Sequence, residues 1–310
     1  METIRRAVID VGTNSVKLLV ADVSGRHVQP VHEESRQTRL GKGFYETHQL
    51  QPESIQRTAE AVAEFEKIAR EHDSTSTRVI ATSAARDAVN PRDLTNAIER
   101  ASGLKTEIIS GGREADWAFL GVTTDAELTA KPLLLLDVGG GSTEFILGHG
   151  TKKSFAHSFP LGTVRLMEKF PHSDPPTRGE FNACRDWLKD FLRGQVRPQL
   201  GPFLENESGE IQLVGTGGTT SILARIDLKL ERFDRDRIEG ARLSLTQVKA
   251  HRKQLWSLPL AERKEIPGLP KLRADVILTG VIIYEAVMEE FSFNELRVST
   301  RGLRFAAVMD

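Results

Sequence analysis

The feature that most constrains the fold of this chain is a strand pattern that occurs twice. An apolar run ends in Asp10-Val11-Gly12, a polar turn follows at Thr13–Ser15, and a second apolar run begins. The same design returns at Asp137-Val138-Gly139, after Leu133–Leu136 and before Phe145–Leu147. Independent local causes would not reproduce the whole strand, turn and strand. The repeat therefore predicts two related lobes that arose by duplication of one fold.

The spacing and the intervening pattern indicate an α/β architecture. The two aspartates, at positions 10 and 137, are 127 positions apart, an ordinary size for one domain. Apolar residues after Pro52 follow helical spacing, and a short apolar run comes next at Val79-Ile80-Ala81. We expect an interdomain cleft that carries one phosphate-cradling turn on each wall.

Composition and charge exclude several kinds of partner. The 310 residues are 39% apolar and 27% charged, enough to bury a sizeable core. With 42 basic and 43 acidic residues the net charge is −1, so no overall positive field recruits nucleic acid or membrane. No apolar run reaches the roughly 18 to 20 residues of a membrane span, and the N-terminus lacks a secretion signal. We expect a cytoplasmic protein that holds anions locally, through glycine turns and single arginines.

Some conspicuous residues do not fit a known chemical motif. Cys184 is the single cysteine, which excludes an internal disulfide framework and a CxxC metal site. Gly41-Lys42-Gly43 lacks the spacing of a nucleotide P-loop. His72-Asp73 has no matching histidines, and Lys152-Lys153 is most simply a solvated turn. None of these is expected to carry chemistry.

The two Asp-Val-Gly turns suit phosphate and metal together. Glycines let backbone N–H groups approach an anion, while the preceding carboxylates, Asp10 and Asp137, can hold Mg²⁺. Glu144 lies seven residues after Asp137, where a tight bend would return it toward the same metal. The alternatives are hairpin turns with local hydrogen bonds and, for Glu144, an ordinary exposed carboxylate. A third glycine turn, Gly217-Gly218-Thr219, follows a short strand and could direct its amides into the same cleft.

Two further residues could take part in catalysis. Glu114 follows Ser110-Gly111-Gly112 in the first turn of a predicted helix, where it could accept a proton from an attacking water. The alternative is an acidic residue that merely stabilises the helix. Arg86 follows three small residues and could bridge two phosphate oxygens, although a surface ion pair with Asp87 or Glu99 fits equally well.

Taken together, these residues resemble the exopolyphosphatase and guanosine pentaphosphate phosphohydrolase (Ppx/GppA) family, which belongs to the actin and sugar-kinase superfamily. The resemblance covers nearly the whole chain in seven ordered motifs: Ile9–Ser15, Ala81–Arg86, Ser110–Ala115, Asp137–Glu144, Pro160–Arg165, Gly215–Thr219, and Pro267–Pro270 leading to Arg273-Ala274-Asp275.

This resemblance implies a fold, an activity and a set of site residues. The fold would be two ribonuclease-H-like (actin-like ATPase) domains, residues 1–125 with 300–310 and residues 126–299. The reaction would be attack of water on a terminal phosphate of polyphosphate, with Glu114 as base and a Mg²⁺ or Mn²⁺ ion near Asp10, Asp137 and Glu144. The residues expected to hold phosphate are Thr13, Asn14, Ser15, Arg86, Gly139, Gly140, Gly141, Ser142, Thr143, Gly217, Gly218 and Thr219.

Several alternatives remain open at this point. The nearest is removal of the 5′ terminal phosphate from guanosine pentaphosphate, which would use the same residues. A kinase of the same superfamily would need an acceptor hydroxyl and an aspartate base, and a non-catalytic phosphate or nucleotide sensor would bind without turnover. Family likeness also suggests a homodimer. Because the chain ends at Asp310, without the further C-terminal region of long members, we expect shorter polyphosphates as substrates.

Overall fold

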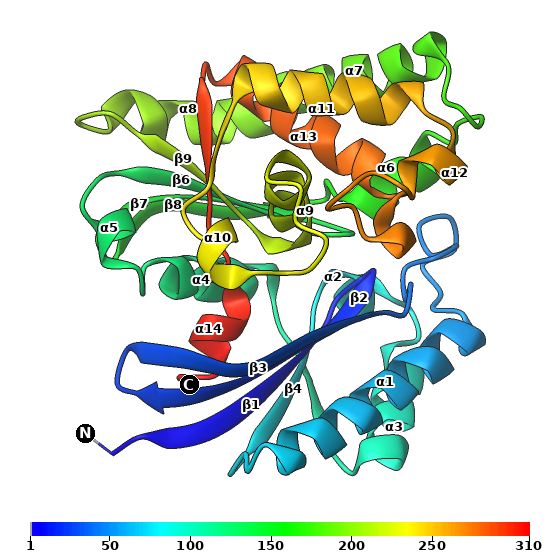
Figure 1. The fold of residues 1–310 in the computed structure, drawn as a ribbon, viewed down its shortest axis with the longest axis vertical. Helices are drawn as coiled ribbons and strands as arrows, with labels where there is room; N and C mark the ends of the chain where they lie inside the picture. The colour runs from blue at the N-terminus through cyan, green and yellow to red at the C-terminus, as the bar shows by residue number, and fades with distance from the viewer. Residues whose placement is uncertain (1) are drawn as a thin grey trace. The chain divides into compact units, whose positions relative to one another are not determined.

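The computed structural model describes residues 2–310 of the chain. It divides into two compact units, Met1–Thr124 with Arg301–Asp310, and Asp125–Thr300 (Figure 1). Each unit contains one mixed β-sheet with helices packed against it. Within residues 2–310, no helix is both long enough and apolar enough to cross a bilayer.

The sheet of the first unit has five strands in the order β3-β2-β1-β4-β5. Strands β1, β2 and β3 are antiparallel neighbours, and β4 and β5 run parallel to β1. This mixture of one antiparallel meander and two parallel additions is the ribonuclease-H-like arrangement. The strands are β1 (Ile4–Val11), β2 (Ser15–Ser24), β3 (His27–Gln37), β4 (Thr77–Ala81) and β5 (Thr106–Ile108).

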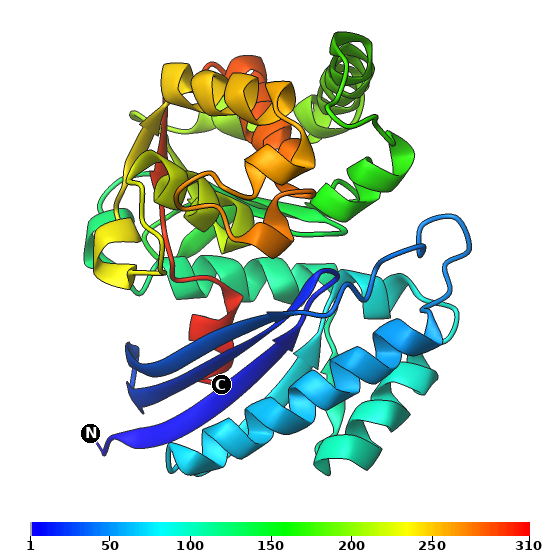
Figure 2. The ribbon, with the colours of Figure 1, turned by 45° about the vertical axis from the view of Figure 1, so that its right-hand side comes forward.

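Helices cover both faces of this sheet, because successive strand residues point to opposite sides. Ile9 and Val11 pack with α1 (Pro52–Glu71) and α3 (Pro91–Ser102) in one apolar cluster. Val8 packs on the other face with Trp117 and Phe305. Figure 2 shows α1 on one face of the sheet, and α4 (Gly111–Val122) and α14 (Leu303–Ala307) on the opposite face. The short helix α2 (Ser83–Asp87) follows β4.

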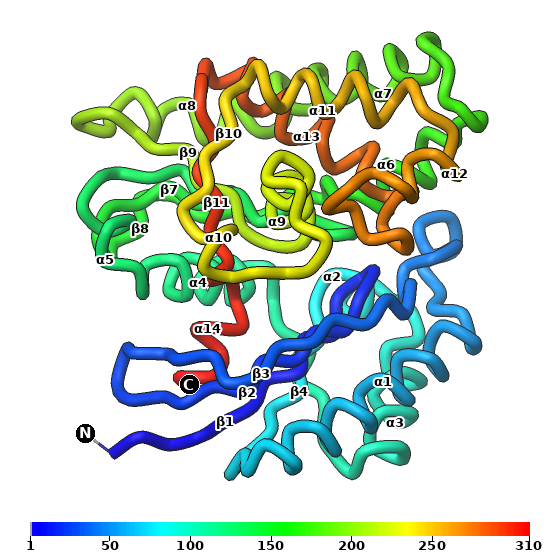
Figure 3. The backbone as a smooth tube through the Cα atoms, in the orientation of Figure 1, coloured from blue at the N-terminus to red at the C-terminus, as the bar shows by residue number. Residues whose placement is uncertain are grey.

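The C-terminal segment lies within the first unit, where α14 contacts α4 and β1 (Figure 3). Helix α14 packs on α4 so closely that a Cβ atom on Gly121 would lie under 3.0 Å from the Gly302 carbonyl. The Arg304 guanidinium donates to the Leu18 carbonyl at 2.7 Å and lies 3.4 Å from Glu33. Asp310 accepts from Arg78 and Arg113 at 3.0 Å each. The last ten residues are therefore a structural part of the first unit.

The second unit repeats the first. Its sheet has the order β10-β11-β9-β6-β7-β8, in which β6, β7 and β8 are antiparallel neighbours and β9 and β11 continue parallel to β6. Only the antiparallel edge strand β10 is additional. The strands are β6 (Leu133–Val138), β7 (Thr143–His149), β8 (Lys152–Phe159), β9 (Gln212–Thr216), β10 (Arg242–Ser244) and β11 (Glu295–Val298).

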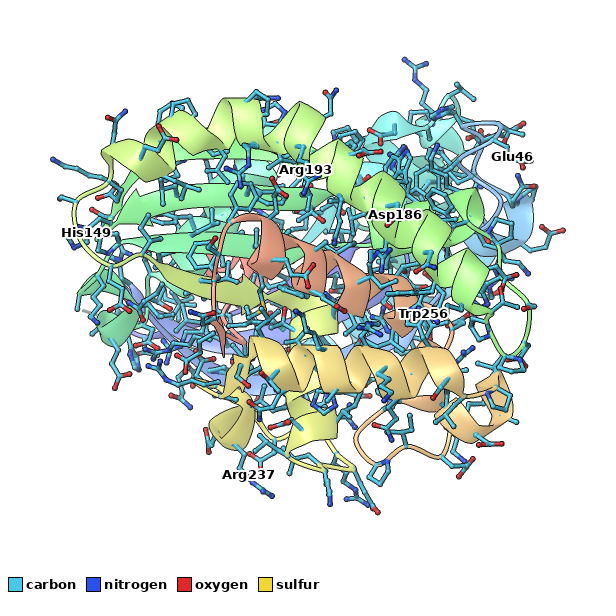
Figure 4. The ribbon with its side chains drawn as sticks, turned by 90° about the horizontal axis from the view of Figure 1, so that it is seen from above. Glu46, His149, Asp186, Arg193, Arg237 and Trp256 are labelled. Atoms are coloured by element: carbon cyan, nitrogen blue, oxygen red, sulfur yellow. The ribbon has the colours of Figure 1, made fainter. Side chains whose placement is uncertain are left out.

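The helices of the second unit surround a central apolar helix, α13 (Ile277–Glu290), which is buried along almost its whole length. Figure 4 shows α13 between α7 and α11. Trp256, labelled there, donates its indole N–H to the Leu278 carbonyl at 3.0 Å. The other helices are α5 (Ala126–Thr129), α6 (Thr163–Lys169), α7 (Arg178–Phe191), α8 (Arg197–Asn206), α9 (Gly217–Asp227), α10 (Arg235–Ile238), α11 (Leu245–Ser257) and α12 (Leu260–Arg263); a π-turn at Leu192–Val196 joins α7 to α8, and a 3-10 turn occupies Lys271–Arg273.

The predicted duplication and α/β class are confirmed by these two matching sheets. The first hairpin, the helix after Pro52 and the strand around Val79–Ala81 also lie where the sequence places them.

Candidate functional site

In the first unit, the predicted metal ligand Asp10 is buried beside the first turn, with 4% of its surface exposed. It stands directly opposite Lys17 in the β1–β2 pair, so the two side chains share one face of the sheet. Its Oδ1 atom has no hydrogen-bond partner within residues 2–310. Burial raises the pKa of Asp10, and the positive charges of Lys17 and Arg304 oppose that shift.

The turn after Asp10 is closed by a hydrogen bond from the Gly12 amide to the Ser15 carbonyl, 3.0 Å long. Thr13, Asn14 and Ser15 are all buried. Among the described residues, the Thr13 hydroxyl and the side-chain nitrogen Nδ2 of Asn14 have no hydrogen-bond partner. Buried polar atoms in proteins are normally paired, so unpaired ones at a turn are consistent with a ligand that completes them.

Glu114 lies in the first turn of α4, whose N-cap Ser110 accepts a hydrogen bond from the Arg113 amide. Only 7% of Glu114 is exposed. Arg86 donates from Nη1 to the Glu114 carboxylate at 2.8 Å and to the Ile109 carbonyl at 3.2 Å. The surface pair expected for Arg86 is present in weaker form, since its Nε lies 3.8 Å from Asp87. The main partner of Arg86 is thus the predicted base.

These residues share one edge of the first sheet, because β1, β4 and β5 are parallel and their carboxyl ends lie side by side. The Thr82 amide donates to the Val11 carbonyl at 3.2 Å, and the Ile109 amide donates to the Ala81 carbonyl at 3.0 Å. The strands that lead to Asp10 and Glu114 are therefore two strand spacings apart, roughly 10 Å. Ligands of α/β sheets bind at such carboxyl edges.

In the second unit, Asp137 and Glu144 stand directly opposite each other in the β6–β7 pair. Opposite residues of an antiparallel pair lie on the same face, with Cβ atoms about 4.5 to 5.5 Å apart. Glu144 is 1% exposed and accepts a hydrogen bond from the Ser158 hydroxyl at 2.7 Å. The reading of Glu144 as an exposed strand residue is therefore wrong. Two like charges in this position destabilise a sheet unless a cation or a proton lies between them.

The glycine turn between these carboxylates is packed tightly. The Gly139 amide donates to the Ser142 carbonyl at 2.9 Å. Gly162 lies so close behind the turn that a Cβ atom there would be under 3.0 Å from the Gly140 carbonyl group and the Gly141 nitrogen. The guanidinium Nε of Arg165 donates to the Gly141 carbonyl at 2.9 Å. The turn is fixed from behind by the segment that follows β8.

The third glycine turn begins helix α9, beside Asp137. Gly217 has a φ of +90°, and a Cβ atom on it would lie 2.5 Å from the Asp137 carboxylate oxygen. Gly218 lies next to Arg273: a Cβ atom on Gly218 would lie 3.5 Å from Nη2 of the Arg273 guanidinium. Glycine is needed at Gly217 both for the backbone angle and for the approach of the carboxylate.

The predicted site residues thus gather at two sheet edges. The first unit brings together Asp10, Thr13, Asn14, Ser15, Arg86 and Glu114, and the second brings together Asp137, Glu144, Gly139, Gly140, Gly141, Ser142, Thr143, Gly217, Gly218 and Thr219. Sequence reasoning missed Lys17, Arg165 and Arg273 as site residues. The repeat could have pointed to Lys17, because Lys17 lies 127 positions before Glu144, the same offset that separates Asp10 from Asp137.

Comparison with known proteins identifies the chain. Residues 19–309 match the Ppx/GppA phosphatase family. Exopolyphosphatase 2 of Mycobacterium tuberculosis is 34% identical over 98% of this chain and 97% of its own length. An exopolyphosphatase from Cytophaga hutchinsonii has a similar structure, with a TM-score of 0.85, 30% identity and coverage of 97% of this chain and 96% of its own. The Aquifex aeolicus Ppx/GppA enzyme gives a TM-score of 0.78 at 30% identity, over 99% of both chains.

These matches define the class of the protein as a phosphoanhydride hydrolase. Within that class, the chain belongs to the Ppx/GppA phosphatase family.

Proposed function

We propose that the protein is an exopolyphosphatase, which uses Mg²⁺ to hydrolyse the terminal phosphate of inorganic polyphosphate. Relatives named exopolyphosphatase cover nearly the whole chain, which supports this substrate class. The observation that carries the proposal is the opposed pair of Asp137 and the buried Glu144, beside two glycine turns. Such an arrangement suits a cation and an anionic substrate together.

The acidic pair fits a divalent metal on physical grounds. Within residues 2–310 no group of three or more His, Cys, Asp or Glu side chains could enclose an ion. Mg²⁺ binds through one or two carboxylates together with substrate phosphates and water, so two facing carboxylates suit it better than a closed cage would. When bound, it would offset negative charge on the phosphoryl oxygens. Mn²⁺ has the same preference for oxygen ligands.

The two units divide the electrostatic task differently. In the first unit the buried Asp10 faces Lys17, whereas in the second unit Asp137 faces Glu144. Asp10 therefore faces a positive charge across the strand pair, whereas Asp137 faces a second carboxylate. We accordingly propose Asp137 and Glu144 as the principal metal ligands of the second unit. Asp10, whose Oδ1 has no hydrogen-bond partner among residues 2–310, is the metal ligand proposed for the first unit.

Glu114 is proposed as the general base that takes a proton from the attacking water. Its carboxylate accepts a hydrogen bond from Arg86 at 2.8 Å, and an ionised carboxylate is the form that can accept a proton from water. The same contact holds the carboxylate in one orientation. Because a guanidinium carries five N–H donors, Arg86 can serve Glu114 and also bind a phosphate oxygen. We propose the amides of the Thr13–Ser15 turn as phosphate-binding groups of the first unit, and those of the Gly139–Thr143 and Gly217–Thr219 turns as phosphate-binding groups of the second.

Replacement of Glu114 by glutamine tests this proposal. Glu114→Gln should slow phosphate release from polyphosphate with Mg²⁺ by about 10²- to 10⁴-fold, the usual contribution of a general base. Binding of polyphosphate should persist, since glutamine keeps the shape of the side chain. The control is Glu71→Gln, which removes an exposed carboxylate at the far end of α1.

The assay should compare polyphosphates of graded length with guanosine pentaphosphate. Comparable inertness of the wild type toward all of them would defeat the proposed hydrolysis. Preference for guanosine pentaphosphate would assign the nucleotide substrate instead. A Glu114→Gln rate equal to that of the wild type would remove Glu114 from the reaction.

A further inference from the structure

The segment after the third strand is built alike in both units. In the first unit it is Arg39-Leu40-Gly41, and in the second it is Pro160-Leu161-Gly162. Both leucines are fully buried. Each glycine lies against the turn that follows the first strand of its own unit. A Cβ atom on Gly41 would lie under 3.0 Å from Thr13, and a Cβ atom on Gly162 would lie under 3.0 Å from Gly140. We call residues 38–43 the Leu-Gly arm of the first unit.

This arm is bonded directly to the first turn through its backbone. The Thr38 and Arg39 amides both donate to the Asn14 carbonyl, at 3.2 and 3.0 Å. The Gly41 amide donates to the Thr13 carbonyl at 2.7 Å. Three backbone hydrogen bonds within four residues fix the position of the arm relative to the turn. A side chain on the arm therefore has a defined place beside Thr13–Ser15.

The arm differs from its counterpart in charge. Arg39 precedes the leucine of the first unit, where the second unit has Pro160. Lys42 follows the glycine of the first unit, where the second unit has Thr163. Arg39 has a φ of +54°, a left-handed conformation that costs free energy in any residue other than glycine and is retained where surrounding contacts enforce it. The Lys42 amide donates to the Arg39 carbonyl at 3.1 Å. The backbone of a basic residue is thus held in a strained form next to the turn.

Lys42 is exposed, and within residues 2–310 its ammonium group forms no ion pair. An isolated surface lysine is usually just solvated. Lys42 differs because it directly follows Gly41, whose amide is bonded to Thr13. Consecutive Cα atoms are about 3.8 Å apart, so the flexible side chain can place its ammonium within one side-chain length of the turn.

We propose that the Leu-Gly arm of the first unit is a subsite for the inner phosphates of a polyphosphate chain, with Lys42 as its principal cation. The inference rests on the proposed function, since it supposes that a terminal phosphate binds at Thr13–Ser15. A lysine ammonium is a mobile point charge, which suits a repeating anion that offers no fixed geometry. Chains long enough to reach Lys42 bind more tightly than short ones.

The test compares chain lengths in three variants of Lys42. Lys42→Ala and Lys42→Glu should raise the KM for long-chain polyphosphate by up to about fivefold, the range of a single exposed charge contact. The KM for tripolyphosphate should rise much less, so the ratio of the two values is the readout. Lys42→Arg should restore the wild-type ratio. The matched control is Lys152→Ala, which removes an exposed lysine from the end of the second sheet opposite its glycine turn.

Direct binding separates this inference from the proposed function. Fluorescently labelled long-chain polyphosphate should bind Lys42→Glu more weakly than Lys152→Ala, with a smaller dependence of affinity on salt, whether or not phosphate is released. If the wild type releases no phosphate from any polyphosphate, the proposed function fails, and this binding comparison still decides the subsite. Equal binding by the two variants, or equal changes in KM at both chain lengths, would overturn the role of Lys42.

Discussion

Replacement of Gly162 by alanine would test how far the position of the Gly139–Ser142 turn depends on the segment after β8, which packs against it. Gly162 has φ −143° and ψ 162°, an extended conformation that alanine adopts without strain. The effect of the added methyl group is therefore purely steric. It would lie under 3.0 Å from three backbone atoms of Gly140 and Gly141, whereas ordinary Cβ contacts are 3.4 to 4 Å.

The size of the effect follows from that overlap. Relief requires the turn and the segment after β8 to separate by up to about 1 Å, and overpacking of this kind costs about 1 to 3 kcal/mol. For a unit of this size the melting temperature should fall by roughly 2 to 12 °C. A shift of about 1 Å in a residue that positions substrate can cost roughly 10²-fold in rate. We expect Gly162→Ala to lose most of its phosphate release while it remains folded at room temperature.

Two further glycines supply a graded control. A Cβ atom on Gly41 would meet chiefly the Thr13 methyl group, which can rotate away, so Gly41→Ala should be milder. A Cβ atom on Gly194 would meet nothing within 4 Å, and alanine there should be neutral or stabilising by about 0.5 to 1 kcal/mol. Melting followed by circular dichroism and phosphate release from polyphosphate would rank the three. A Gly162→Ala protein as active and as stable as Gly194→Ala would refute the reasoning.

Three other outcomes are expected. Asp137→Asn and Glu144→Gln should each require at least roughly tenfold more Mg²⁺ for half-maximal phosphate release, since even outer partners of metal ligands contribute that much; an unchanged requirement would remove the pair from the metal site. Burial raises the pKa of Cys184 to about 12, so at pH 8 a thiol reagent should label the unfolded chain far faster than the native protein, and rapid native labelling would contradict this. Hydrogen bonds from the Thr177 and Ser173 amides lower the pKa of Glu180 to about 2, below its usual value of about 4.3. That stabilisation is present at neutral pH and is lost as the pH falls from about 4 toward 2, so Glu180→Ala should melt below the wild type at pH 7 and together with it near pH 2; an equal gap at both pH values would exclude the mechanism.

The sequence was sufficient for the parts of the fold that local patterns encode. The duplicated Asp-Val-Gly motif predicted both sheets, and helical spacing after Pro52 predicted α1. Glu114 was expected in a first helical turn, where the structure has it, because an N-cap serine and a following apolar stripe are local signals. Such features depend on a few neighbouring residues.

Other features depended on contacts that spacing alone does not reveal. Arg86 could have paired with several carboxylates, and its pairing with Glu114 follows from the parallel arrangement of β4 and β5. The burial of Glu144 likewise required the strand register that sets it opposite Asp137. Gly41-Lys42-Gly43 was dismissed as a nucleotide motif, and its position behind Thr13 became visible only from the backbone hydrogen bonds of the arm.

The docking of Arg301–Asp310 in the first unit has a consequence for biosynthesis. A ribosome makes this segment only after all 176 residues of Asp125–Thr300 have been synthesised. Until then α4 lacks its partner α14, and Leu18 lacks the hydrogen bond from Arg304. Domains usually fold as the nascent chain emerges, N-terminal part first. Here the second unit can complete its core while the first still lacks α14, so the N-terminal half matures only after the second unit has been made.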